Sequence, residues 1–570
     1  MLVSRYIVDF IKSKGIEYVF GITGTVVNMC FVALGEKNGI DYVCPLHEQT
    51  ASMGADGYSR VSGNIGIAIG TSGPGTTNMV TGCAGAFVDS VPVLYLVGQT
   101  SISNSKQSNQ VRHFGFQELD TEKVFSSITK YVSTVDEPLK TKYELEKALY
   151  IALSDRKGPT MLIFPENVLY SEIDETKLDS FKPNKNKKNV FENYDNIVKL
   201  IKDSKRPLLL LGNGVHISKA ESLAQTFIKR TSIPFALTYP ARDLMETNNI
   251  LNVGSIGIFG SQYGNMAIQN ADLLICVGAR MDRYVTGSNP SLFSPNSKKV
   301  VVDIDEEELN KLKSLSVLPN VAVLEDAALF FSKMLKYEYG CINDKYEKWI
   351  DFINLNKKMF PLCQKSFYSE NTVNPYVFIK SLSDGLKEGD YLFTDTGLSA
   401  VWVGQSFEFK KGQRWFTQFS YSSMGYGLSA SIGGSFATKS RVICITGDGG
   451  IQMSLQELAT LKYYNKNVKV FVVCNDGYGL IQKTQDDYNN GHYATDRYNH
   501  VPLPDLKRLV EAYDLKCLEI QTNEQLISII KESLSFDGPV VCLVHIPISK
   551  KITPRIKGNK KLDEMYPYFD

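Results

Sequence analysis

Two turns in the last third of the chain carry residues that suit metal and phosphate chemistry. The apolar run 441–445 leads into Gly447-Asp448-Gly449-Gly450, and the run 468–474 ends at Asn475. Glycines after a strand let the backbone approach an anion, and the helix N-terminus that follows adds N–H groups. If both runs belong to one βαβ unit, Asp448 and Asn475 meet at one sheet edge, where oxygen ligands beside a phosphate suit Mg²⁺. The alternative is an ordinary turn capped by Asp448, and Asn475 on the next strand argues against it.

These turns resemble a motif of thiamine-diphosphate-dependent enzymes, in which Gly-Asp-Gly is followed further along the chain by Asn-Asn. The Asn pair appears here as Cys474-Asn475, and only the second Asn is the family's metal ligand. The resemblance implies that Asp448, Asn475 and the carbonyl of Gly477 hold Mg²⁺, which anchors the diphosphate of the cofactor. It also implies that neighbouring residues of both turns line the cofactor site, namely Gly447, Gly449, Gly450, Tyr478 and Gly479.

Thiamine chemistry also requires a carboxylate in a second place. The cofactor's own 4′-imino group removes its C2 proton, and a carboxylate hydrogen-bonded to the pyrimidine N1′ stabilises that form. Glu48 stands in Pro45–Ala51 at an expected strand-to-helix junction, ahead of Met53–Arg60 and Gly73–Asn78. These segments resemble the pyrimidine-binding domain of the family, which implies that Glu48 is the activating carboxylate. A lone Glu at a helix start would otherwise be a partner of the helix dipole.

Within this family the chain resembles acetolactate synthase (the acetohydroxyacid synthase large subunit). Phe116-Gln117-Glu118 and Ser423–Leu428 match its Phe-Gln-Glu and Thr-Met-Gly-Phe-Gly-Leu stretches. The resemblance implies that Gln117 faces the thiazolium and that Met424 holds the cofactor in a V shape, with its 4′-nitrogen against C2. As a residue type, Met424 would also suit plain core packing. The resemblance further implies cofactor contacts at Gly73, Gly397 and Ser422 and substrate contacts at Gly24 and Phe116.

The middle of the chain resembles the flavin-binding domain of acetolactate synthases. Gly212-Asn213-Gly214 follows an expected strand, and 277–287 is similar to their Gly-Ala-Arg-Phe-Asp-Asp-Arg-Val-Thr-Gly stretch. The resemblance implies FAD as a structural cofactor, with contacts from Gly212, Gly214, Arg280, Asp282 and Asp303. The sequence lacks a G-x-G-x-x-G fingerprint here, so the alternative is a vestigial domain that binds nothing.

Two departures from acetolactate synthase concern the acceptor substrate. In an ungapped match Tyr284 stands where those enzymes have an Arg that recognises the acceptor carboxylate, and Thr484 stands where they have a Trp that shapes the acceptor pocket. The alternative is that Arg283, one place earlier, takes the role of that Arg. A neutral phenol and a smaller side chain should change the acceptor. We therefore predict a carboligase that decarboxylates pyruvate, or a related 2-ketoacid, and transfers the two-carbon hydroxyethyl unit to an aldehyde or keto-sugar in preference to a second pyruvate.

Two other functions remain as alternatives. A non-ligating 2-ketoacid decarboxylase would protonate the two-carbon unit instead of transferring it, and the product formed from pyruvate alone separates the two reactions. An inactive regulatory protein that only binds the cofactor comes from a different class. The presence of Glu48, Asp448 and Asn475 argues against that last reading.

Short apolar runs alternate with amphipathic stretches along the whole chain, which is typical of parallel sheets covered by helices. We therefore predict an α/β protein with three doubly wound parallel-sheet domains. They are a pyrimidine-binding domain (1–180), a central domain (190–335) and a domain for the diphosphate and Mg²⁺ (370–548), followed by a tail (549–570). The polar stretch 182–196 reads as a tether, and the expected strands are 65–69, 92–97, 160–164, 207–211, 272–277, 299–302, 391–394, 441–445, 468–474 and 540–545.

Composition limits the classes of partner. Lys and Arg number 62 against 61 Asp and Glu, so no overall positive field is available for nucleic acid or an anionic membrane. The apolar runs are strand-length, and no secretory signal is visible. Ten Cys without a C-x-x-C pair suit reduced thiols in the cytoplasm. We expect small-molecule substrates only, and the family implies a homodimer or homotetramer with each site between two chains.

Overall fold

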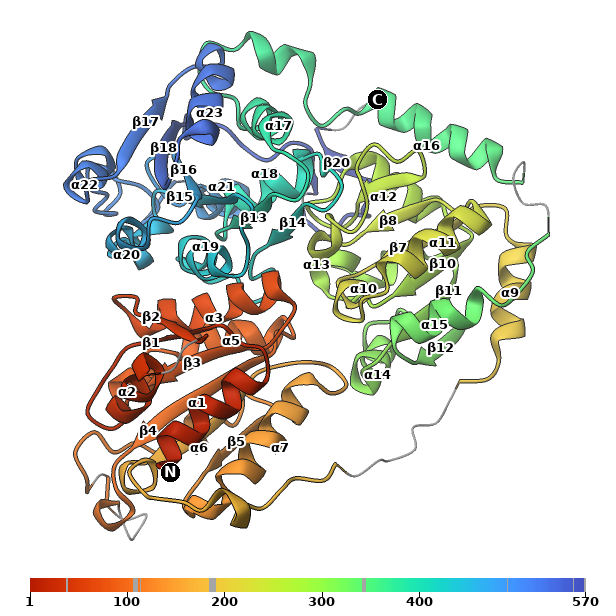
Figure 1. Cartoon of the computed structure of the whole chain (residues 1–570). Helices are drawn as coiled ribbons and strands as arrows, with labels where there is room; N and C mark the ends of the chain where they lie inside the picture. Colours follow the sequence, from red (N-terminus) through yellow and green to blue (C-terminus); the bar gives the residue numbers. More distant parts are fainter. Residues whose placement is uncertain are drawn as a thin grey trace.

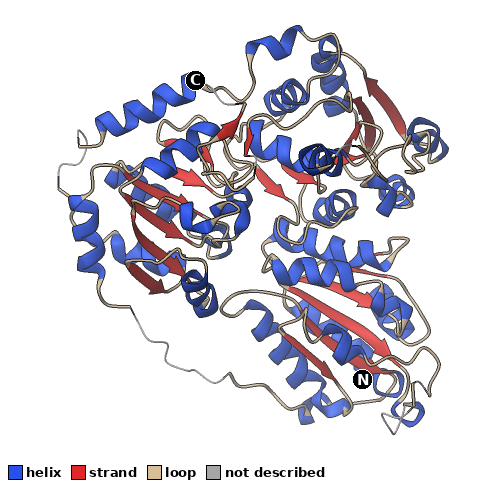
Figure 2. Cartoon of the chain, turned by 180° about the vertical axis from the view of Figure 1, so that it is seen from behind, coloured by secondary structure: helices blue, strands red, loops and turns tan. Residues whose placement is uncertain are grey.

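The computed structural model describes the 570-residue chain except for residues 37–38, 106–110, 113, 184–190, 341–344, 490, 557 and 568–570. Residues 184–190 of the predicted tether 182–196 therefore lie outside the described residues. Three parallel six-stranded sheets follow one another along the chain, with helices on both faces of each (Figures 1 and 2). The predicted α/β class is confirmed, while the exact domain boundaries stay a prediction.

The first sheet has the strand order β2-β1-β3-β4-β6-β5. Its strands are β1 Tyr18–Gly21, β2 Asp41–Val43, β3 Gly66–Gly70, β4 Val93–Gln99, β5 Tyr131–Thr134 and β6 Thr160–Pro165. Its helices are α1 Val3–Ser13, α2 Asn28–Glu36, α3 Glu48–Ser62, α4 Pro74–Thr77, α5 Val80–Val88, α6 Thr121–Phe125, α7 Thr141–Leu153 and α8 Glu166–Leu169.

The central sheet has the order β12-β11-β10-β7-β8-β9. Its strands are β7 Pro207–Leu211, β8 Phe235–Leu237, β9 Asn252–Ser255, β10 Leu273–Val277, β11 Lys298–Asp303 and β12 Val321–Leu324. Its helices are α9 Tyr194–Asp203, α10 Gly214–Ile217, α11 Glu221–Thr231, α12 Gln262–Asn270, α13 Arg283–Thr286, α14 Glu306–Ser314 and α15 Ala327–Met334, and α16 Glu347–Met359 follows as a connector.

The third sheet has the order β14-β13-β15-β16-β18-β17. Its strands are β13 Tyr391–Thr394, β14 Arg414–Phe416, β15 Val442–Gly447, β16 Val468–Cys474, β17 Lys516–Ile520 and β18 Val540–His545. Its helices are α17 Pro375–Gly385, α18 Leu398–Ser406, α19 Tyr426–Phe436, α20 Glu457–Tyr464, α21 Gly479–Tyr488, α22 Leu506–Ala512 and α23 Leu526–Ser535.

Every predicted apolar run falls on a strand, because a strand covered on both faces must be apolar throughout. All five residues of β7 and all five of β10 are buried, and these two strands pair in parallel. Shorter edge strands such as β2 and β14 lack that signature and are found only in the structure.

One continuous core joins the first and third sheets. Helices α3 and α19 pack against each other, and the buried residues around them form a single apolar cluster that includes Met53 and Leu428. Figure 1 shows these two helices meeting where the red and teal parts of the chain touch. A Cβ placed on Gly57 would lie 2.1 Å from the carbonyl oxygen of Ala430, so the helix backbones are almost in contact.

The C-terminal tail returns from the third sheet to the central one. Arg555 forms a two-pronged ion pair with Asp487 on α21, and the side chain of Leu562 packs on Gly287 in the central domain. A short antiparallel pair, β19 Arg555–Ile556 with β20 Met565–Tyr566, closes the tail. Among the described residues, no helix has the length and apolar character needed to cross a membrane.

Candidate active site

The carboxyl edge of the third sheet brings the two predicted metal ligands together. Strands β15 and β16 are parallel neighbours, so the residues after them, Asp448 and Asn475, lie side by side. The backbone N–H of Asn475 donates to Oδ2 of Asp448 at 3.0 Å, and that of Gly449 donates to Oδ1 at 2.8 Å. Asp448 is only 4% exposed, and burial raises the pKa of its carboxyl to about 7. A bound cation would supply the positive charge that this buried carboxylate needs.

The turn after Asn475 closes on the glycine loop. Tyr478 lies so close to Gly449 that a Cβ there would come within 2.4 Å of its ring, and only glycine leaves that space. Gly477 has φ +154°, and its position is fixed because Tyr478 N–H donates to Thr495 carbonyl at 2.7 Å. The described residues contain no group of three or more His, Cys, Asp or Glu that could hold a metal ion. The predicted donor set is one carboxylate, one amide and one carbonyl, and such oxygen donors would fit Mg²⁺ completed by water and phosphate oxygens.

Two further loops reach the same edge. Gly397, with φ +91°, precedes α18, and Gly425, with φ +84°, precedes α19. These left-handed turns are open to glycine and strained for other residues. The hydroxyls of Thr396 and Ser422 are hydrogen-bonded to each other, which ties the two loops together. Met424 lies in the second of these loops, directly before Gly425, and is half-buried.

The first domain gathers a second group of predicted residues. Glu48 is the first residue of α3, and its Oε2 accepts a hydrogen bond from Nδ2 of Asn78 at 2.9 Å. Gln117 lies over Gly73, where a Cβ would come 2.9 Å from its carbonyl oxygen, and Ser72 Oγ donates to its side chain at 3.2 Å. The partners of Glu48 and Gln117 are therefore in the first domain, while those of Asp448 are in the third.

The two predicted substrate residues of the first domain differ in their surroundings. Gly24 approaches Thr71 so closely that a Cβ would lie 2.5 Å from the Thr71 side chain. Phe116 is 83% exposed, which is unusual for a large apolar side chain.

A cavity of about 380 Å³ lies among all three domains. Four of the five predicted flavin residues, Gly214, Arg280, Asp282 and Asp303, line it, together with Gly397 and Ser422 of the third domain. Gly212 does not line it: a Cβ there would lie 2.1 Å from the Gly278 carbonyl, so this glycine lets two strand ends approach.

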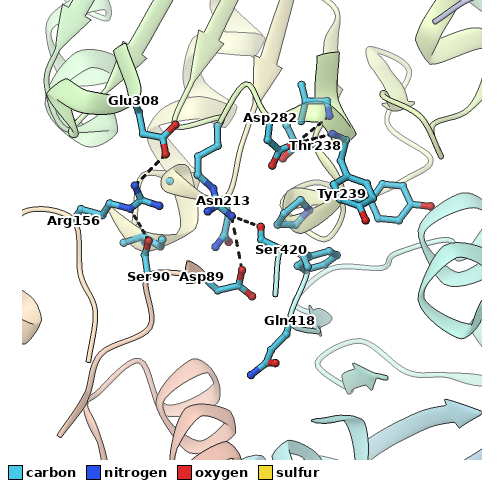
Figure 3. A pocket seen from close by; sticks show the side chains of 18 of the residues that line it. Asp89, Ser90, Arg156, Asn213, Thr238, Tyr239, Asp282, Glu308, Gln418 and Ser420 are labelled. Atoms are coloured by element: carbon cyan, nitrogen blue, oxygen red, sulfur yellow. Dashed lines mark hydrogen bonds and ion pairs between the residues drawn. The ribbon is translucent and has the colours of Figure 1, made fainter. Parts of the chain in front are cut away.

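The cavity has a polar end and an aromatic end. At the polar end Arg156 donates to Glu308 at 3.1 Å and to Ser90 at 2.9 Å (Figure 3). Asp303 lies at the same end, and burial raises the pKa of its carboxyl to about 6. Tyr239, Phe259 and Phe419 form the aromatic end. Such a division suits a ligand with a ribose and phosphates at one end and an apolar ring at the other.

Arg280 and Asp282 also have structural partners. Arg280 donates to the Val88 carbonyl at 2.8 Å and lies 3.8 Å from Asp89, which connects the central domain to the first. Asp282 accepts from the backbone N–H groups of Tyr284 and Val285, so it caps the short helix α13. Oδ1 of this carboxylate therefore has a structural role as a helix cap.

The two acceptor positions are differently placed. Tyr284 is 50% exposed at the aromatic end of the cavity, with its ring 6.0 Å from that of Phe259. Thr484 is exposed on α21, and its hydroxyl donates to the Leu480 carbonyl at 3.0 Å. Leu480 lines the cavity and Thr484 does not.

Several residues at these sites were not predicted. Asp395 is fully buried and follows β13 as Asp448 follows β15. Its position after an apolar run and before Thr396-Gly397 could have marked it in the sequence as a residue of the sheet's carboxyl edge. Arg60, Asp56 and Tyr426 form a buried network between α3 and α19. Asp56 and Arg60 are four residues apart on α3, but nothing in the local sequence marks Tyr426 as their partner, because it lies far along the chain.

Comparisons with known proteins agree with this geometry. The chain matches the N-terminal TPP binding domain of thiamine pyrophosphate enzymes over residues 1–124, their central domain over 194–334 and their C-terminal TPP binding domain over 395–544. It is 29% identical to the acetolactate synthase large subunit of Lactococcus lactis subsp. lactis (strain IL1403), covering 99% of this chain and 95% of the relative. It is 30% identical to the chloroplastic acetolactate synthase of Arabidopsis thaliana, covering 98% and 83%.

Proposed function

Because the chain belongs to the thiamine pyrophosphate enzymes of the acetolactate synthase type, we propose that it decarboxylates pyruvate and joins the remaining two-carbon unit to an acceptor carbonyl. The observation that carries this proposal is the side-by-side placement of Asp448 and Asn475 above a glycine loop. Bound thiamine diphosphate supplies the nucleophilic carbon and the electron sink for the loss of CO₂. The chain's own residues must bind, orient and activate it.

Each group of residues has a separate task. Asp448, Asn475 and the Gly477 carbonyl would hold Mg²⁺, and the N–H groups of the glycine loop would bind the diphosphate. Glu48 would hydrogen-bond to the pyrimidine N1′ and stabilise the imino form of the cofactor, and its bond to Asn78 keeps the carboxylate oriented. Met424 would prop the two rings of the cofactor toward each other.

The chain's active unit is proposed to be a homodimer or homotetramer. Large apolar side chains next to the site residues are exposed in a single chain: Leu46 by 59%, Phe116 by 83% and Met453 by 45%. A second copy of this chain would cover them and bring Glu48 of one copy toward Asp448 of the other. Light scattering under assay conditions tests this, because an active monomer would contradict it. Location in the cytoplasm stays a prediction.

For the acceptor, we propose an aldehyde or keto-sugar in preference to a second pyruvate. The support is Tyr284, whose half-exposed phenol at the cavity replaces a guanidinium. One neutral hydrogen bond in place of a charged fork weakens binding of a carboxylate by about 1.5–3 kcal/mol, roughly ten- to a hundredfold. A non-ligating 2-ketoacid decarboxylase, which would protonate the two-carbon unit instead of transferring it, is the second candidate.

FAD is proposed for the cavity among the three domains. Its polar end offers Arg156 and Asp303 for a ribose and phosphates, and its aromatic end offers Tyr239 and Phe259 for an apolar ring. The lining residues therefore fit a dinucleotide. A yellow colour and flavin fluorescence in pure protein would support this assignment, and colourless protein after incubation with FAD would overturn it.

The function is tested by incubating pure protein with pyruvate, thiamine diphosphate, Mg²⁺ and a panel of aldehydes and keto-sugars, with mass spectrometry of the products. A carboligation product supports the proposal. Acetaldehyde alone would establish the decarboxylase instead, and acetolactate as the only product would refute the acceptor assignment.

Glu48→Gln tests the activating residue. The amide keeps the shape of the side chain but cannot stabilise the imino form of the cofactor through N1′. Exchange of the cofactor's C2 proton should therefore slow by about 100-fold or more while the cofactor still binds. Glu36→Gln, at an exposed carboxylate paired with Arg5, is the matched control and should leave exchange unchanged. Unchanged exchange in Glu48→Gln would remove Glu48 from this role.

A further inference from the structure

Asp395 is a fully buried carboxylate at the carboxyl edge of the third sheet. It follows β13 directly, and its backbone N–H donates to the Ile445 carbonyl of the neighbouring strand β15 at 2.9 Å. A buried carboxylate must have its hydrogen-bonding capacity met, or it is costly. The partners of Asp395 therefore show what the residue is for.

Each partner belongs to a different loop of the cofactor site. Oδ1 accepts from the backbone N–H of Thr396 at 2.9 Å, in the loop that contains Gly397. Oδ2 accepts from the backbone N–H of Gly425 at 2.9 Å, directly after Met424. Oδ2 also accepts from Oγ1 of Thr446 at 2.9 Å, directly before the Gly447–Gly450 loop. One carboxylate thus connects all three loops.

The surrounding glycines leave no room for these loops to move closer. A Cβ on Gly450 would lie 2.8 Å from Oδ2 of Asp395, and a Cβ on Gly427 would lie 2.8 Å from its backbone nitrogen. The metal-site loop and the first turn of α19 are therefore packed directly against Asp395. Their separation is set by the length of its side chain and by hydrogen bonds to its two oxygens.

We propose that Asp395 is a positioning residue that sets the distance between Met424 and the glycine loop of the diphosphate site. This inference rests on the proposed function, in which the loop anchors one end of thiamine diphosphate and Met424 props the other. Holding both ends at a fixed separation keeps the reacting atoms in place, and an error of about 1 Å costs roughly 100-fold in such sites. The metal ligands themselves do not contact Asp395 through any of these bonds.

The test separates binding of the cofactor from its activation in the full-length holoenzyme. In Asp395→Asn the amide has two orientations. In one, its NH₂ replaces Oδ2 and faces the donors of Gly425 and Thr446; in the other, it replaces Oδ1 and the bond from Thr396 is lost. The C2-proton exchange rate should fall about 100-fold, because Met424 moves relative to the diphosphate. The affinity for thiamine diphosphate and Mg²⁺ should change by less than about fivefold, because the ligand set is intact. The rise in Tm that these two ligands cause should stay nearly the same.

Two other variants make the result decisive. Ser399→Ala is the matched control: it removes a buried hydrogen bond to the backbone carbonyl of Asp395, at 3.2 Å, and leaves the carboxylate alone. It should change neither exchange nor affinity by more than about twofold. Thr446→Val removes one of the three donors and should slow exchange by about three- to tenfold, which keeps the test valid if Asp395→Asn does not fold.

Two results would overturn the proposal. One is exchange within about twofold of wild type in Thr446→Val or Asp395→Asn. The other is equal loss of exchange and of cofactor affinity, because that is the effect of general damage to the site. If the wild-type holoenzyme exchanges the C2 proton but forms no carboligation product, the proposed function fails while the role of Asp395 stands.

Discussion

Replacing Gly57 by Ala should harm both stability and activity, although Gly57 lies in the middle of a helix far from the metal site. The added Cβ would lie 2.1 Å from the Ala430 carbonyl oxygen and 2.9 Å from the Ala430 Cα. Real Cβ atoms essentially never approach closer than 3.0 Å. Helices α3 and α19 would therefore have to separate by about 1 Å, because neither backbone atom can rotate away as a side chain does.

The cost follows from that separation. Overpacking of a buried contact typically costs about 1–3 kcal/mol, which corresponds to a fall in Tm of roughly 3–10 °C for domains of this size. Activity should fall further than stability alone explains. Glu48 begins α3 and Met424 stands just before α19, so both would shift, and a shift of about 1 Å costs up to roughly 100-fold in turnover.

The assays are thermal unfolding and turnover of pyruvate by the purified holoenzyme. Gly35→Ala is the matched control, because Gly35 also lies in a helix but a Cβ there meets nothing within 4 Å. It should raise stability by about 0.5–1 kcal/mol and leave turnover unchanged. If Gly57→Ala melts and turns over like wild type, the close helix contact does not exist as described and the reasoning is refuted.

Three further variants test other parts of the structure. Tyr426→Phe removes a buried hydrogen bond to Asp56 and should lower the free energy of unfolding by about 1.5–3 kcal/mol, measured by denaturant unfolding; no change would contradict the network. Burial raises the pKa of Asp303 to about 6, so the folded state loses stability as pH rises from about 4 to 6. Asp303→Asn should therefore increase the free energy of unfolding at pH 7.5 by at most about 3 kcal/mol, seen as a higher Tm, and should leave Tm unchanged at pH 4. Arg555→Met breaks the two-pronged ion pair with Asp487, which keeps Lys483 as a partner, so it should cost about 1.5–3 kcal/mol, measured as faster proteolysis of the tail; equal cleavage rates would rule this out.

The sequence alone predicted the parts of the fold that local pattern encodes. Buried parallel strands such as β7 and β10 must be apolar along their whole length, so each appears as a continuous run. Asp448 and Asn475 follow two such runs, and the parallel pairing of their strands was enough to place them together. Edge strands β2 and β14 were missed, because short, half-covered strands carry little periodic signal.

Only the tertiary structure decided how the three domains meet. The contact of Gly57 with Ala430 and the hydrogen bonds of Asp395 join segments that are distant along the chain or belong to different loops. It also placed Tyr284 at the cavity and Thr484 away from it, a distinction that matching positions in a sequence does not make. The reason is physical: residue type and spacing determine what a segment prefers locally, whereas the distances between catalytic groups depend on how closely whole helices and sheets pack.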